Sequence, residues 1–149
     1  MTPYEGCNDY INAVFTNSYT QCDGYVLTQM PLPDTVIDFW RLVYDHAVSA
    51  IVMLNDLDQL DETCGQYWSL SSSGENYGPF IVETTAEILS DPSITIRDFT
   101  VTNTYLFHFH RWAEDCPVPS SKMALFELID LVETCQKHAP DQPVLVHCM

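Results

Sequence analysis

Hydrophobic and polar positions follow different periods along this chain, and each period predicts a structural element. Residues 144–146 (Val-Leu-Val) are consecutive aliphatics without polar alternation, a pattern typical of a strand covered on both faces of a mostly parallel sheet. The apolar run at residues 48–54 predicts a second buried strand. Residues 9–15 and 25–29 predict an early pair of strands, with a turn signal at Asp23-Gly24 between them.

Two segments have the three-to-four-residue spacing of a helix with one buried stripe. The first covers residues 34–45, and its predicted core stripe is Val36, Phe39, Trp40, Val43 and Tyr44. The second covers residues 121–137 after a capping Ser120 or Ser121, and its predicted core stripe is Leu125, Leu128, Ile129, Val132 and Cys135.

The middle of the chain is rich in β-branched and aromatic residues. Residues 80–85, 94–104 and 105–112 predict antiparallel strands, and residues 66–68 predict the end of another strand. Helices that lead into buried strands, with a meander between them, predict an α/β fold with a mixed sheet.

Composition narrows the class of protein. The chain has 149 residues, one domain or a piece of a larger one, and its hydrophobic content of 46% is sufficient for a core. Its formal charge of −16 argues against direct contact with nucleic acid or an anionic membrane surface. The six cysteines are scattered, and there is no leader peptide or membrane-length apolar run, so a cytosolic location is expected.

The end of the last strand carries the first candidate for chemistry, His147-Cys148. Ligands of open α/β sheets bind beyond the carboxyl ends of the strands, and a thiolate there is a nucleophile if its surroundings lower its pKa. The alternative is an inert buried cysteine at a strand end.

Two further groups of residues are candidates. Glu114 and Asp115 lie in a proline-containing loop at residues 112–119, where a carboxylic acid can protonate a leaving group; the alternative is two exposed loop acids. His108 and His110 share one face of a strand, and with Cys148 or Cys116 they suggest zinc. Because no C-x2-C spacing accompanies them, we expect no metal and no cofactor, with one histidine in the core and the other facing solvent.

Seven segments, in order along the chain, resemble motifs of the protein-tyrosine phosphatase family. They are DYINA at 9–13, YVLTQMPLPDT at 25–35, DFWRLV at 38–43, IVML at 51–54, CGQYW at 64–68, FHFHRW at 107–112 and VLVHC at 144–148. On this resemblance the chain is identified as a member of the family, which implies a highly twisted mixed sheet flanked by helices.

The resemblance also implies a mechanism. The Cys148 thiolate would attack the phosphorus of phosphotyrosine in a protein substrate and form a cysteinyl-phosphate, with His147 as its supporting neighbour and Glu114 in the place of the proton donor. In the family, a loop after the cysteine, ending in arginine, cradles the phosphate with N–H groups at a helix N-terminus, which favours both the thiolate and the phosphate.

The departures from the family pattern affect the expected activity. The family writes W-P-D where this chain has Trp112-Ala113-Glu114, and Met149 stands where active domains usually have serine. The family's recognition loop is not recognisable at the start, and the arginine falls beyond Met149. We therefore expect residues 1–149 to be a partial phosphatase domain, truncated at the C-terminus, that has no turnover by itself.

Glutamate in the acid position is similar to the second, membrane-distal domains of tandem receptor phosphatases. That similarity implies a companion phosphatase domain as a partner and a location in the intracellular part of a single-pass membrane receptor. Two functions stay open for the parent protein: an active phosphatase, or a regulatory pseudophosphatase domain that binds or modulates a partner domain.

Overall fold

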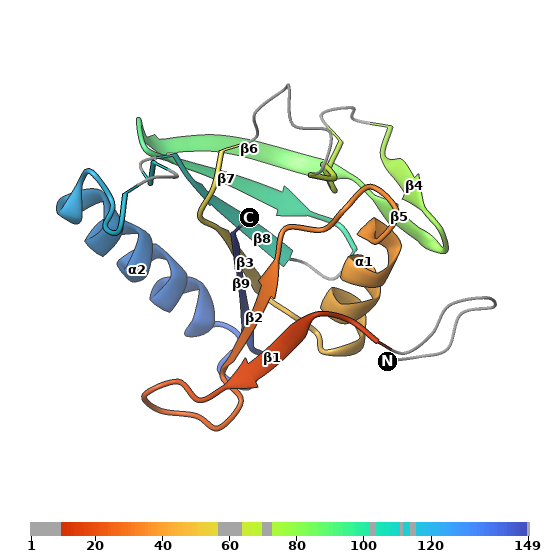
Figure 1. Ribbon diagram of the computed structural model, residues 1–149, viewed down its shortest axis with the longest axis horizontal. Coiled ribbons are helices and arrows are strands. Elements are labelled where there is room, and N and C mark those ends of the chain that lie inside the picture. The colour runs from red at the N-terminus through yellow and green to blue at the C-terminus, as the bar shows by residue number, and fades with distance from the viewer. Residues whose placement is uncertain are drawn as a thin grey trace.

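A seven-stranded twisted sheet forms the centre of the computed structural model, which describes residues 10–56, 64–69, 73–101, 104–110, 112–113 and 116–148 (Figure 1). The strand order is β1-β2-β9-β3-β8-β7-β6. The bounds are β1 Ala13–Thr16, β2 Tyr25–Gln29, β3 Ala50–Met53, β6 Thr84–Asp91, β7 Ile94–Phe99, β8 Thr104–Phe109 and β9 Val144–Cys148. A separate two-stranded sheet consists of β4 Glu75–Tyr77 and β5 Phe80–Val82.

The four central strands are parallel, and the strands outside them are antiparallel. Ile51 of β3 lies opposite both Leu145 of β9 and Leu106 of β8, and Val26 of β2 lies opposite Leu145 from the other side. β1 pairs with β2, β6 with β7 and β7 with β8, all antiparallel. This arrangement confirms the predicted mixed sheet.

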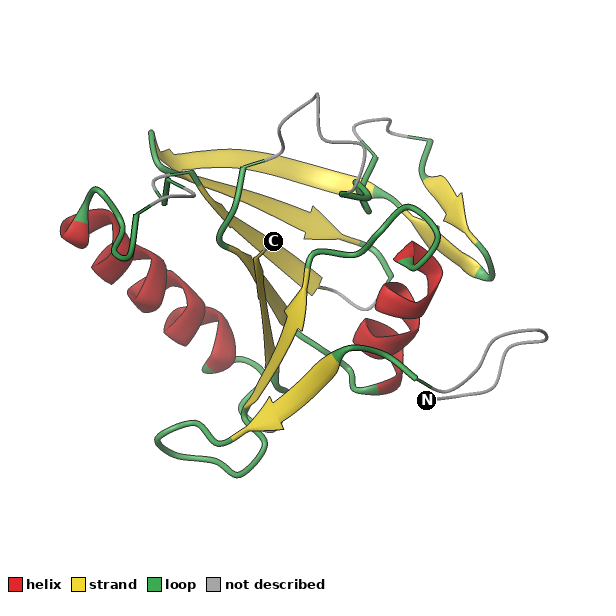
Figure 2. Cartoon of the chain, viewed as in Figure 1, coloured by secondary structure: helices red, strands yellow, loops and turns green. Residues whose placement is uncertain are grey.

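Two helices cover opposite faces of the sheet, α1 Val36–Asp45 and α2 Lys122–Gln136 (Figure 2). Side chains of a strand alternate between its two faces, so each buried strand contributes to two cores. Ile51 and Met53 belong to the cluster that contains the buried face of α1, whereas Ala50 and Val52 belong to the cluster of α2. Burial on both faces explains why β3 and the first three residues of β9 are continuous apolar runs.

The predicted stripe of α1 is confirmed at four positions and wrong at the fifth. Val36, Phe39, Trp40 and Val43 are buried, but Tyr44 is 56% exposed, and its ring is tilted against that of Phe80 with 5.7 Å between centroids. The sequence pattern also left out two residues that are buried, Arg41 and Leu42. The β4–β5 hairpin packs on a second side of the helix, where Tyr77 contacts Trp40 and Phe80 contacts Tyr44.

The capping and most of the core of α2 agree with the sequence. The Ser121 hydroxyl accepts a hydrogen bond from the Ala124 N–H at 3.2 Å, which places the helix start where it was predicted. Leu128 and Val132 are buried, and Leu125 and Cys135 are partly buried against the same cluster. Ile129 is 43% exposed, so its prediction as a core residue is wrong, since it lies at the rim of an apolar groove described below.

Several strand predictions need correction. Residues 66–68 are not a strand, although Tyr67 and Trp68 are buried. The strand predicted at 80–85 is split between β5 and β6, and the one predicted at 94–104 ends at Phe99. Of the strand predicted at 9–15, residues 10–12 lie outside β1, which begins at Ala13. β4 and most of β6 were not predicted, because their side chains are largely exposed and leave no buried alternation in the sequence.

Within the described ranges, no helix combines the length and the apolar character that crossing a membrane requires.

Candidate active site

Strand direction gathers the candidate residues at one edge of the sheet. Since β2, β9, β3 and β8 are parallel, their carboxyl ends lie together. Cys148 lies opposite Gln29, and its carbonyl accepts a hydrogen bond from the Met30 N–H at 2.6 Å. The His147 carbonyl accepts one from the Leu54 N–H at 3.1 Å. The last two residues of β9 are therefore fixed by the backbones on both sides of it.

The His147 side chain points into the core on the α1 side. It is 1% exposed, its Nε2 lies 2.7 Å from the Tyr67 hydroxyl, and its ring meets the Phe39 ring at nearly a right angle. Burial, with a smaller effect of the nearby His108, lowers the pKa of His147 to about 3. Burial also raises the pKa of Tyr67, an effect that Arg97 partly opposes. Both groups are therefore neutral near pH 7, which fits a positioning role for His147 rather than proton transfer.

Tyr67 is held in place by tertiary contacts, since its segment is not part of a strand. Its carbonyl accepts a hydrogen bond from Trp40 Nε1 at 2.9 Å, and its ring packs on Phe39 with 4.5 Å between centroids. Nearby, the Gly65 N–H donates to the Pro31 carbonyl at 2.7 Å. The contact between Tyr67 and His147 could not be predicted from local patterns, because 80 residues separate the two.

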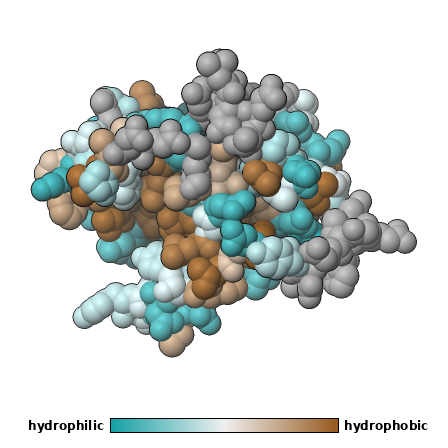
Figure 3. Space-filling view, in the orientation of Figure 1, coloured by the Kyte–Doolittle hydropathy of each residue, from teal (hydrophilic) through white to brown (hydrophobic). Residues whose placement is uncertain are grey.

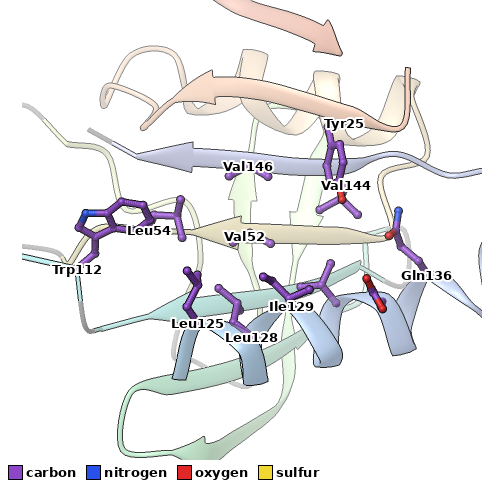
Figure 4. Close-up of a pocket in the computed structure, with 12 residues that line it drawn as sticks. Tyr25, Val52, Leu54, Trp112, Leu125, Leu128, Ile129, Gln136, Val144 and Val146 are labelled. Carbon is purple, nitrogen blue, oxygen red and sulfur yellow. The ribbon is translucent and has the colours of Figure 1, made fainter. Parts of the chain in front are cut away.

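Cys148 is exposed, in contrast to the histidine before it. Successive side chains of a strand point to opposite faces, so its side chain leaves β9 on the face opposite that of His147. On that face, Val146 lines a groove together with Leu54 and Trp112 (Figure 4). The exposed thiol therefore lies at the sheet edge to which the Trp112 segment also comes.

The described part of the segment after β8 is a compact turn. Trp112 Nε1 donates to the Cys116 carbonyl at 3.0 Å, and the Cys116 N–H donates to the Ala113 carbonyl at 2.9 Å. Glu114 and Asp115, the predicted acids, lie outside the described residues. The distance from Glu114 to Cys148 therefore stays a prediction, while the flanking Trp112 is at the expected edge.

The groove beside Trp112 is apolar and lies between α2 and the sheet. Its cavity volume is about 180 Å³, and most of its lining comes from aliphatic side chains of β3, β9 and α2, with Val52, Val144 and Leu128 among them. Figure 3 shows apolar residues gathered over the side of α2 that faces the strands.

His108 and His110 lie on one face of β8 and its extension, as predicted, with 3.8 Å between ring centroids. His108 is buried and His110 is about a third exposed, which agrees with one core and one solvent-facing histidine. The third member of this group is Asp56, not Cys148 or Cys116.

The chain belongs to the protein-tyrosine phosphatase family, since the family model described as protein-tyrosine phosphatase matches residues 1–149. By family it is a hydrolase of that type, and the predicted resemblance and fold are confirmed.

Relatives with receptor-type names share over a third of their aligned residues with it. The chain is 38% identical to human receptor-type tyrosine-protein phosphatase alpha, covering 94% of this chain and 18% of the relative. It is 39% identical to chicken (Gallus gallus) receptor-type tyrosine-protein phosphatase U, covering 95% and 11%. The chain thus spans less than a quarter of the length of these relatives.

Solved structures agree on the fold. The catalytic domain of human protein tyrosine phosphatase non-receptor type 18 superposes with a TM-score of 0.84 at 30% identity, covering 97% of this chain and 53% of that one. A structure of the same phosphatase with HER2 phosphopeptides also superposes with a TM-score of 0.84, at 29% identity over 97% of this chain and 56% of that one.

Proposed function

We propose that this chain is part of a phosphatase domain that hydrolyses phosphotyrosine in proteins, with Cys148 as the nucleophile. The observation that carries the proposal is the exposed thiol at the carboxyl end of a central parallel strand, immediately after a buried and hydrogen-bonded histidine. The matched phosphatase that is solved with phosphopeptides supports the class of substrate.

In the proposed reaction, the Cys148 thiolate attacks phosphorus while the bond from phosphorus to the tyrosyl oxygen breaks. Glu114 donates its proton to the leaving phenolate. Water then attacks the cysteinyl-phosphate, its proton passes to the Glu114 carboxylate, and inorganic phosphate leaves with the thiolate restored.

The chain as it stands is proposed to be inactive. A phosphate dianion beside Cys148 needs cations or N–H donors, yet the two arginines in the described part of the chain are already paired. Arg41 bonds Asp38 at 2.8 Å, and Arg97 bonds Glu87 at 2.7 Å. The described lysines, Lys122 and Lys137, flank α2. The formal net charge of −16 on the chain also repels a phosphate dianion.

The test compares two proteins. The 149-residue chain should release no phosphate from an aryl phosphate, and a polypeptide that continues through a phosphate loop with an arginine should do so. Cys148→Ser should abolish that release, whereas Cys22→Ser, at another exposed cysteine, should leave it unchanged. Turnover that survives Cys148→Ser would refute the role of Cys148.

A regulatory domain is the second candidate, favoured by Ala113 and Glu114 at positions where the family has Pro and Asp. One extra methylene moves the carboxyl by over 1 Å, and misplacement on that scale can cost roughly 10²-fold in rate. In the longer polypeptide, Glu114→Asp with Ala113→Pro should raise turnover if the loop limits it. No increase would favour the regulatory role, with a companion phosphatase domain as partner.

The receptor-type names of the relatives support a place for this domain in the intracellular part of a membrane receptor. Fractionation of cells that express the full-length protein tests this: recovery in the membrane fraction with the domain protected from external protease is expected.

A further inference from the structure

A further group of residues, outside the site described above, consists of Asp56, His108 and His110. We call these three residues the histidine cluster. The segment after β3 runs beside β8, because Met53 is in register with His108. Asp56 Oδ1 lies 2.6 Å from His110 Nδ1 and 3.4 Å from His108 Nε2. Each residue offers one ligand atom, and these atoms all lie within 4.8 Å of one another.

We propose that the histidine cluster is a binding site for a divalent transition-metal ion of the Zn²⁺ type. Imidazole nitrogen and carboxylate oxygen are common zinc ligands, and three protein ligands with an open fourth position are a common arrangement. The earlier expectation of no metal depended on sequence spacing, because the two histidines and the candidates Cys148 or Cys116 have no C-x2-C pattern. Asp56, 54 residues before His110, supplies the third ligand.

The ligand atoms can surround a tetrahedral ion once the side chains have shifted. Metal bonds of about 2.0–2.2 Å place neighbouring ligand atoms roughly 3.3–3.5 Å apart. The 3.4 Å between Asp56 and His108 already meets this, while the 2.6 Å between Asp56 and His110 must widen by roughly 0.7 Å. The Asp56 side chain is 56% exposed, so it can make that shift and leaves the fourth position open to water.

A supporting hydrogen bond is already in place for His110. Its Nε2 lies 2.9 Å from the hydroxyl of Thr95, which is buried on β7. When Nδ1 binds the ion, the proton moves to Nε2 and is donated to the Thr95 oxygen. Metal-ligating histidines commonly donate their second N–H in this way, which fixes both the tautomer and the ring.

His108 has two neighbours that oppose an ion, and both contacts must change when it binds. Its Nε2 lies 2.9 Å from the Asn55 carbonyl, so without an ion this nitrogen carries the proton. Binding moves that proton to Nδ1, where Arg97 Nη1 lies 3.5 Å away. Arg97 must turn further toward Glu87, which it already meets at 2.7 Å.

The ion would join the segment after β3 to the residue two positions before Trp112. This inference is independent of the proposed role of Cys148, since neither the thiol nor its substrate takes part. Its consequence is local: metal binding would restrain the start of the segment that carries Glu114.

Zn²⁺ alone, titrated into the 149-residue chain by calorimetry, provides the test. One ion per chain is expected. Asp56→Asn and His110→Gln, both at partly exposed positions, should each weaken binding at least tenfold. Thr95→Val should weaken it by roughly 10–100-fold, the usual effect of removing a supporting hydrogen bond. The matched controls Asp34→Asn and His138→Gln should change the affinity by less than twofold.

Two measurements on the unmutated chain keep the test decisive if a variant fails to fold. Zn²⁺ should shift the ring ¹⁵N resonances of His108 and His110 and leave those of His46 and His138 in place. Co²⁺ should bind without thiolate charge-transfer absorption, which separates this site from the exposed cysteines. Absence of saturable binding, thiolate bands, or unchanged affinity in His110→Gln would each overturn the proposal.

Discussion

Tyr67→Phe isolates the hydrogen bond that holds His147 beneath the end of β9. The substitution removes one oxygen and keeps the ring, whose packing on Phe39 and Trp68 at centroid distances of 4.5 and 4.9 Å does not involve the hydroxyl. The oxygen lies 2.7 Å from His147 Nε2, and both side chains are almost fully buried. Any loss of stability therefore reports the hydrogen bond rather than a cavity.

The expected decrease in the free energy of unfolding follows from the hydrogen bond that His147 loses. His147 Nδ1 is buried and has no hydrogen-bond partner among the described residues, so Tyr67 is the partner of the ring. Leaving a buried polar group unsatisfied costs about 1–3 kcal/mol. With a urea m-value of about 2 kcal/mol per M, a loss of about 2 kcal/mol lowers the unfolding midpoint by about 1 M.

Urea unfolding, followed by tryptophan fluorescence, measures this change. The matched control is Tyr77→Phe, whose hydroxyl meets the exposed Glu75 at 3.1 Å and whose loss should cost less than about 0.5 kcal/mol. In a double-mutant cycle with His147→Leu, the effect of Tyr67→Phe should disappear. A midpoint for Tyr67→Phe that matches the control would refute the reasoning.

Three more outcomes follow from the described contacts. His147 stays neutral in the folded chain down to about pH 3 but takes up a proton below about pH 6.5 when unfolded, so its contribution to stability is complete above pH 6.5 and is lost as the pH falls, by up to about 1.4 kcal/mol per pH unit; urea midpoints measured with a chelator present should fall with decreasing pH, and His147→Leu should reduce the slope by this amount and leave the part due to His108, whose pKa is lowered to about 4. Gly65→Ala should lower thermal stability by about 1–3 kcal/mol, since an added Cβ would lie 2.9 Å from the backbone of Leu32; an unchanged melting temperature would contradict this. Ser121→Ala should cost about 1 kcal/mol through loss of the α2 cap, and Ser121→Asp should restore it.

The elements that the sequence predicted best are those whose burial repeats along the chain. β3 and β9 are buried or half-buried at nearly every position and begin with consecutive apolar residues, and the spacing of α1 and α2 follows the face that each helix packs on the sheet. β6 was largely missed, because it is an edge strand with Ile88 and Leu89 exposed, and its neighbours in space rather than its own pattern define it.

The candidate site also has a part that local sequence features predict and a part that they do not. The position of Cys148 at the end of a central strand could be predicted, because an apolar run and the residue after it are local features. The two contacts that define its surroundings, Tyr67 with His147 and Asp56 with His110, join residues 80 and 54 positions apart. Residue spacing in the sequence carries no information on such pairs, so they are found only in the three-dimensional fold.

Successive side chains of a strand point to opposite faces of the sheet, so the neighbouring residues His147 and Cys148 have different roles. The histidine points to the α1 side, 1% exposed and with a pKa lowered to about 3, so it cannot exchange protons with substrate near neutral pH. The exposed thiol points the other way, toward the face that also holds Trp112. A leaving phenolate would therefore have to take its proton from another segment, and the proposed donor Glu114 belongs to the segment that continues from Trp112. This division predicts that His147→Leu lowers stability and turnover of the longer polypeptide without shifting the pH profile of turnover. A shifted profile would mean that the histidine takes part in proton transfer.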